Sequence, residues 1–152
     1  MSRSIALLCA FESTPSRVPT LYRIVHKQYQ DEPFSGTGGL YNKSRWASRG
    51  QLVSYAADHL ATATLEKLTG LQRADLMTEM VYARAEIDDQ HAAVLSEQDL
   101  PEGWGQLPAP DATREVGDAW LKAEDSVVLR VPSVVLPRSY NYVVNAAHPD
   151  RS

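Results

Sequence analysis

The chain has 152 residues, 43% of them hydrophobic and 22% charged, and a formal net charge of −4. These values predict one globular domain over residues 1–152 and exclude a disordered chain, and a pI near 5.5 argues against direct binding of duplex nucleic acid. The apolar runs are shorter than the roughly 20 residues that span a bilayer, Ile5–Phe11 leads to no signal cleavage site, and Cys9 has no cysteine partner, so we expect a cytoplasmic protein.

Four elements are predicted in the first half of the chain from the spacing of apolar residues and from turn-forming residues. They are a strand at Leu21–His26, a loop at Asp31–Ser44, a strand at Gln51–Ala57 and a helix at His59–Thr69. Asp58 precedes this helix and is predicted to cap it, and Gly70 is predicted to end it.

The second half predicts two further strands and one helix. The strands are a long alternating one at Met80–Ile87 and a β-branched one at Ser126–Val131 that Pro132 ends. The helix follows an irregular surface connection at Leu100–Pro110, and Asp111 is predicted to cap it. Val116 and Trp120 share a face of the helix, which favours Trp120 as a core residue. Strands outnumber helices and do not alternate with them regularly, so we predict an α+β fold.

A series of short motifs resembles the RES domain over residues from about 20 to 152. In chain order they are Tyr22-Arg23, Phe34 to Leu40, Ser44-Arg45-Trp46, Val53-Ser54-Tyr55, Leu65-Glu66, Leu100 to Trp104, Gly117 with Trp120, Val131-Pro132-Ser133, Asn141-Tyr142, Asn145 and His148-Pro149. The RES family is named for an arginine, a glutamate and a serine. In this chain the resemblance assigns them to Arg23, Glu66 and Ser133.

The resemblance implies a fold like that of the ADP-ribosyltransferases, a mixed sheet with a few short helices. It implies a bacterial toxin that degrades NAD, as its substrate, by cleaving the nicotinamide-ribose bond, with no metal. It also implies neutralisation by an Xre-type helix-turn-helix antitoxin, a toxin homodimer, and contact with DNA only through the antitoxin. Each of these properties is an expectation for this chain.

The chemistry of that cleavage calls for a carboxylate, because positive charge develops on the ribose as nicotinamide leaves. The resemblance gives this role to Glu66, with Ser133 orienting Glu66 or the ribose and Asn145 contributing to the NAD site. Taken without the resemblance, Glu66 could equally be an exposed helix carboxylate beside Lys67, and Ser133 an ordinary turn residue.

Basic residues concentrate in the first 50 positions, which hold seven Lys and Arg against three Asp and Glu. Arg23 and Arg45 lie in this part, and a guanidinium suits phosphate because it offers paired donors and keeps its charge. Tyr55 can stack on the nicotinamide ring. The alternatives are arginines that face solvent and a tyrosine of the core.

Three other sites are not supported by the spacing of their residues. The segment Gly36–Gly39 lacks the spacing of a dinucleotide-binding fingerprint, and the four histidines have no zinc-ligand spacing. Ser133 has no nucleophile-elbow motif around it, so it is not predicted to be the serine of a hydrolase.

Two alternatives to NAD hydrolysis or phosphorolysis remain open. The same pocket could transfer ADP-ribose to a cellular protein, since only the acceptor differs. The protein could also be an inactive toxin-like binding partner in a regulatory complex, because Asn145-Ala146-Ala147-His148 lacks the proline that often follows this asparagine in relatives.

Overall fold

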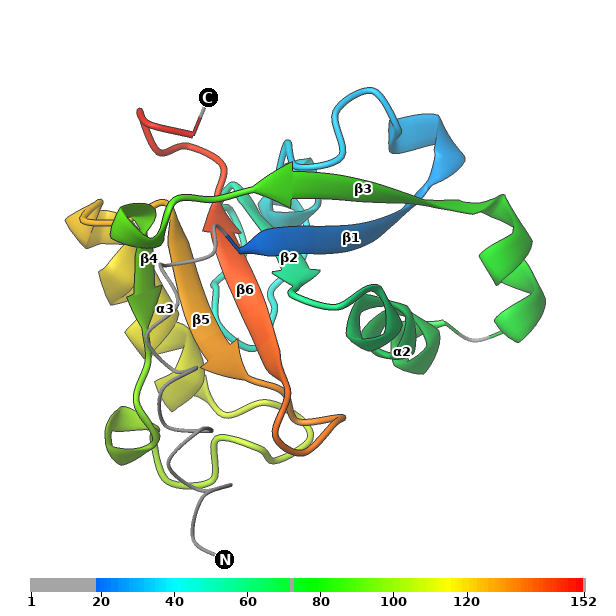
Figure 1. Cartoon of the computed structure of the whole chain (residues 1–152). Helices are drawn as coiled ribbons and strands as arrows, with labels where there is room; N and C mark the ends of the chain where they lie inside the picture. Colours follow the sequence, from blue (N-terminus) through cyan, green and yellow to red (C-terminus); the bar gives the residue numbers. More distant parts are fainter. Residues whose placement is uncertain (1–18, 72, 152) are drawn as a thin grey trace, which may run out of the picture.

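The computed structural model describes residues 19–71 and 73–151, so the apolar run Ile5–Phe11 and Cys9 lie outside the described residues. Its centre is one six-stranded sheet with the strand order β3-β1-β2-β6-β5-β4 (Figure 1). The strands are β1 (Thr20–His26), β2 (Val53–Ala57), β3 (Met80–Glu86), β4 (Ala92–Val94), β5 (Val128–Pro132) and β6 (Tyr140–Asn145). Two α-helices accompany them, α2 (Leu60–Gly70) and α3 (Asp111–Ala123). The predicted α+β fold is confirmed.

Neighbouring strands are antiparallel except for β4 and β5, which are parallel. β1 and β3 pair along their whole length, and β2 pairs with β6 from Val53 opposite Asn145 to Ala57 opposite Asn141. β5 pairs with β6 so that Val131 lies opposite Asn141. The end of β2, the end of β5 and the start of β6 therefore lie side by side at one end of these central strands.

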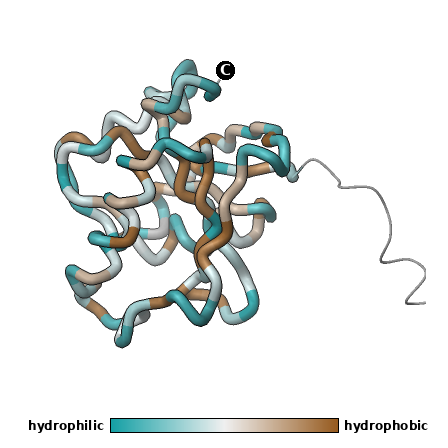
Figure 2. The backbone as a smooth tube through the Cα atoms, turned by 90° about the vertical axis from the view of Figure 1, so that its left-hand side faces the viewer, coloured by the Kyte–Doolittle hydropathy of each residue, from teal (hydrophilic) through white to brown (hydrophobic). Residues whose placement is uncertain are grey.

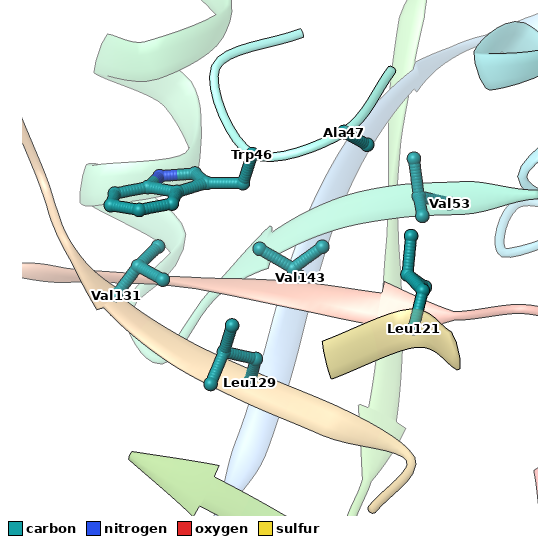
Figure 3. Packing of buried hydrophobic residues seen from close by; sticks show 7 residues of the cluster. All are labelled: Trp46, Ala47, Val53, Leu121, Leu129, Val131 and Val143. Atoms are coloured by element: carbon teal, nitrogen blue, oxygen red, sulfur yellow. The ribbon is translucent and has the colours of Figure 1, made fainter. Parts of the chain in front are cut away.

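The larger apolar core lies between the sheet and α3 (Figure 3). Its buried members are Trp46, Ala47, Val53, Leu121, Leu129, Val131 and Val143. Trp46 and Ala47 come from the irregular segment between β1 and β2, so the core fixes this segment as well as the strands. Trp120 packs against the cluster without being fully buried, and its indole N–H donates to Ser126 Oγ at 2.8 Å.

A second apolar cluster is formed mainly by other side chains of β2, β5 and β6 together with one from β1. Its buried members are Leu21, Ala56, Val127, Val128, Tyr142 and Val144. The tube in Figure 2 shows long hydrophobic stretches through the middle of the molecule, with mostly hydrophilic stretches around them. Apolar residues on both faces of the central strands explain why these strands are more buried than the edge strand β3.

The structure confirms the strands predicted in the first half of the chain and the absence of regular strands or α-helices from the connection Leu100–Pro110. β3 alternates as predicted, with Tyr82, Arg84 and Glu86 exposed and the residues between them partly buried. The structure contains two further strands, β4 and β6, that were not predicted.

The end of α2 at Gly70 is predicted correctly, whereas the predicted N-caps of both α-helices are wrong. In α3, Pro110 occupies the N-cap position and Asp111 is the first helical residue. In α2 the predicted cap is Asp58. His59 occupies the N-cap position, and the Asp58 carboxylate lies 2.9 Å from the His59 ring instead of capping the helix. Gly70 is the last residue of α2, and Leu71 follows it in an extended conformation. A left-handed glycine is therefore not what ends this helix.

Within the described residues, no helix is long and apolar enough to cross a membrane.

Candidate functional site

The Glu66 carboxylate lies where three elements meet. Glu66 is in the second half of α2, and its Oε1 accepts a hydrogen bond from Ser133 Oγ at 2.5 Å and one from Asn141 Nδ2 at 2.8 Å. Ser133 follows the last residue of β5, and Asn141 is the second residue of β6. The structure therefore brings Glu66 and Ser133 together, although 66 positions separate them in the chain.

Ser133 is buried and closes the turn that leaves β5. Its Oγ accepts hydrogen bonds from the backbone N–H groups of Val135 at 3.1 Å and Leu136 at 3.0 Å, while its own O–H goes to Glu66. A hydroxyl has one donor and two acceptor positions. All three are occupied here, so Ser133 fixes the carboxylate to the turn.

Arg23 crosses from β1 to two other segments. Its Nε donates to the carbonyl of Pro33 at 2.7 Å and its Nη1 to the carbonyl of Tyr55 at 2.9 Å. Burial lowers the pKa of Arg23, because a charged group is less well solvated there. Arg23 thus joins β1, the loop after it and β2, and two of its five N–H groups are used in doing so.

Arg45 is placed in a similar way by the connection before α3. Its Nη1 donates to the carbonyls of Trp104 at 2.6 Å and Gln106 at 2.9 Å. Burial lowers the pKa of Arg45, and the negative charge of Glu66 opposes that effect. The carboxylate and Arg45 are therefore close enough to influence one another.

Tyr55 lies in β2 and its ring is largely enclosed. A hydrogen bond joins its hydroxyl to Ser44 Oγ, beside Arg45. Burial raises the pKa of the phenol, since the ionised form would lose its hydration. The hydroxyl holds the Ser44–Trp46 segment against β2, and Tyr55 also lines two cavities.

Two adjoining cavities share Tyr55, Glu66 and Asn141 as lining residues. The smaller, about 220 Å³, also holds Arg23 and Lys67. The larger, about 540 Å³, is lined by Arg45 and by apolar residues, namely Trp46, Leu107, Pro132, Val134 and Val135. Glu66 is thus at the junction of a polar cavity and a more apolar one, with an arginine in each.

Lys67 adds a second cation to the smaller cavity. Burial lowers its pKa, and the positive charge of Arg23 lowers it further. Two like charges in one cavity repel each other, and an anion placed between them would relieve that repulsion. The smaller cavity is therefore suited to an anionic group.

The structure does not place Asn145 in this site. Asn145 is at the opposite end of β6, buried, and its Oδ1 accepts the N–H of Ala147 at 3.0 Å in the turn that follows the strand. It lines a different cavity with Gln51 and Asp118. Asn141 is the asparagine that contacts Glu66, and only its position in a motif next to Tyr142 could have indicated it from the sequence.

Within residues 19–71 and 73–151 there is no cluster of three or more His, Cys, Asp or Glu side chains that could hold a metal ion.

Comparison with known proteins identifies the family of this chain. The RES domain profile matches residues 20–152. A protein of Yersinia enterocolitica named Toxin Res is 34% identical over 128 residues, which cover 84% of each chain. A Toxin Res of Pseudomonas putida is 37% identical over 76% of this chain and 79% of its own. A Sphingobium protein named Prs ADP-ribosylating toxin is 32% identical over 82% of this chain and 79% of its own. The chain belongs to the RES-domain family.

Proposed function

We propose that the protein is a toxin that cleaves the nicotinamide-ribose bond of NAD, by hydrolysis or phosphorolysis. One observation carries this proposal: a fixed carboxylate, Glu66, lies at the junction of two cavities that each contain an arginine. A dinucleotide has a cationic ring, two riboses and a pyrophosphate, and this site offers a partner for each kind of group.

In the proposed reaction the nicotinamide leaves as a neutral molecule and the ribose becomes an oxocarbenium-like cation. The Glu66 carboxylate stabilises that cation from beside C1′. At about 4 Å and an effective dielectric near 20, the attraction is about 4 kcal/mol, which corresponds to roughly a thousandfold in rate if it develops only in the transition state. Water or phosphate then attacks C1′ and yields ADP-ribose or its 1″-phosphate.

The remaining groups hold the substrate. Cations for the pyrophosphate oxygens come from Arg23 and Lys67 in the smaller cavity and from Arg45 in the larger one. Each guanidinium keeps N–H donors beyond those bonded to carbonyls. Tyr55 packs against the nicotinamide ring, and its hydrogen bond to Ser44 fixes the ring plane. NAD is a substrate in this scheme, and no metal takes part.

The proposal includes the partners expected of a RES-domain toxin. An Xre-type helix-turn-helix antitoxin would neutralise the enzyme, the toxin would form a homodimer, and DNA would be contacted only through the antitoxin. The enzyme would act in the cytoplasm, on the cellular NAD pool. Co-expression with the neighbouring reading frame tests the antitoxin: growth arrest on toxin induction should be relieved.

The test of the activity is incubation of the purified protein with NAD, with and without phosphate, and chromatography of the products. We expect nicotinamide together with ADP-ribose, or with ADP-ribose 1″-phosphate when phosphate is present. Glu66→Gln keeps the shape of the side chain and removes the charge, so it should slow nicotinamide release by at least about a hundredfold. Unchanged NAD with the wild-type protein, and harmless overexpression, would favour the inactive binding partner instead.

The second candidate is transfer of ADP-ribose to a cellular protein. It is favoured by the name of the Sphingobium relative, Prs ADP-ribosylating toxin. The bond cleaved is the same and a protein side chain replaces water or phosphate. NAD labelled in the adenylate part, incubated with the protein and a lysate, distinguishes the two: label on a polypeptide, with nicotinamide released only when lysate is present, supports the transferase.

A further inference from the structure

The Glu66 carboxylate is asymmetric in its hydrogen bonding. Oε1 accepts two hydrogen bonds, from Ser133 and Asn141, whereas the described residues give Oε2 no hydrogen bond. An ionised carboxylate accepts hydrogen bonds and donates none, so the two donors at Oε1 favour one orientation of the group. Oε2 is then the oxygen left for a ligand in the cavities.

The two donors to Oε1 are held by different parts of the sheet. Ser133 is fixed by the backbone N–H groups of its own turn, at the end of β5. Asn141 is fixed by β6, where it pairs with Val131 on one side and Ala57 on the other. The carboxylate is therefore tied to two different strands, and together the two bonds restrict the rotation of a side chain that comes from a third element, α2.

We propose that Asn141 is a positioning residue for Glu66: its amide N–H, together with the Ser133 hydroxyl, holds Oε1 so that Oε2 faces the substrate. This inference rests on the proposed NAD cleavage. Asn141 lines both cavities, so its amide lies where the carboxylate and the substrate ribose would meet. A shift of about 1 Å in a catalytic group can cost a hundredfold in rate, and loss of one of two tethers allows such a shift.

Asn141→Asp and Asn141→Ala test this role. Asp keeps the shape of Asn, loses the N–H donor and adds a negative charge that repels Glu66, whereas Ala removes the whole amide without adding a charge. We expect the kcat of NAD cleavage to fall about ten- to a hundredfold in both variants, with the KM for NAD changed less than about threefold. Asn42→Ala is the matched control, because Asn42 is exposed and lines neither cavity, and it should leave both constants unchanged.

A double variant separates positioning from damage to the fold. If Asn141 acts only through the Glu66 carboxylate, Asn141→Ala should have little further effect on kcat in a Glu66→Gln background. A further fall of the same size in that background would overturn the proposal, and so would a wild-type kcat in both Asn141 variants. A wild-type protein that releases no nicotinamide from NAD would overturn the proposed function itself, and is seen in the same experiment without any Asn141 variant.

Discussion

At the scale of single residues, the site consists of side chains whose hydrogen bonds are largely made within the protein. Arg23 and Arg45 each donate to two backbone carbonyls, and Ser133 uses all its hydrogen-bonding positions. These residues therefore hold the walls of the cavities in place in addition to any contact with a ligand. Substitutions here should change stability and activity together.

Ser133→Ala shows this most directly. The variant leaves the N–H groups of Val135 and Leu136 without their acceptor and removes one tether from Glu66. The three hydrogen bonds lost are part-buried and each contributes about 0.5–1.5 kcal/mol net, so we expect the free energy of unfolding to fall by about 1–3 kcal/mol. NAD cleavage should fall as well. Urea denaturation measures the first effect.

Ser139→Ala is the matched control, since it lies in the same turn and uses its backbone carbonyl, not its hydroxyl, to bind the Ser133 N–H. It should keep the wild-type unfolding free energy within about 0.5 kcal/mol. A Ser133→Ala protein as stable as this control would show that the turn does not depend on the hydroxyl.

At the scale of elements, α3 positions the segment that carries Arg45 without contributing a side chain to the cavities. Gly117 of α3 packs directly on the backbone of Trp46, where a Cβ at position 117 would lie 1.5 Å from the Trp46 carbonyl oxygen. The next residue of α3, Asp118, accepts hydrogen bonds from the N–H of Ser48 at 2.9 Å and from its hydroxyl at 2.5 Å. The close approach requires a glycine in the helix.

Gly117→Ala should therefore destabilise the protein, although alanine is favoured over glycine in helices by about 1 kcal/mol. We expect a loss of about 1–3 kcal/mol in unfolding free energy, because helix and segment must move apart. Gly70→Ala is the control in the other helix. Among residues 19–71 and 73–151, a Cβ there meets nothing within 4 Å, and the change should be neutral or stabilising. Thermal unfolding of the two variants compares them, and equal melting temperatures would contradict this account of α3.

The elements also show how far the sequence predicts the fold. Strands with a clear alternation or a β-branched run, such as β3 and β5, are predicted, because the pattern reflects which side chains face the core. β4 has three residues and its place is set by parallel pairing with β5, which no local pattern contains. β6 is buried toward its end on both faces, so it shows no alternation.

For the site, the sequence motifs predict which residues gather but not all their contacts. Arg23, Arg45, Tyr55, Glu66 and Ser133 lie on or against the two cavities. Two contacts depend on strand register. One is the bonding of Arg23 to the Pro33 and Tyr55 carbonyls, and the other is the contact of Glu66 with Asn141 instead of Asn145. Register is a property of the folded sheet, and a four-residue difference along β6 separates one end of the sheet from the other.

At the scale of the whole molecule, stability should respond to alkaline pH through the buried phenol of Tyr55. Its pKa is raised by burial above the ordinary value of 10.0. The stability that depends on the protonated phenol is thus fully present below about pH 10 and is lost as the pH rises through the raised pKa, because the unfolded chain ionises first. Tyr142, whose pKa burial also raises, acts in the same direction, whereas the lowered pKa of Lys67 acts in the opposite one.

Comparison of the wild type with Tyr55→Phe separates the contribution of this phenol from those of Tyr142 and Lys67. At pH 7 the variant loses the hydrogen bond to Ser44 and should be less stable by about 1 kcal/mol. Above pH 10 this difference should shrink by up to about 1.4 kcal/mol for each pH unit, since phenylalanine has no proton to lose. Urea denaturation at pH 7, 10 and 11 measures the difference. A gap that stays constant across these pH values would mean that Tyr55 ionises equally easily in the folded and unfolded chains, and that the enclosed ring beside Arg45 is reached by water.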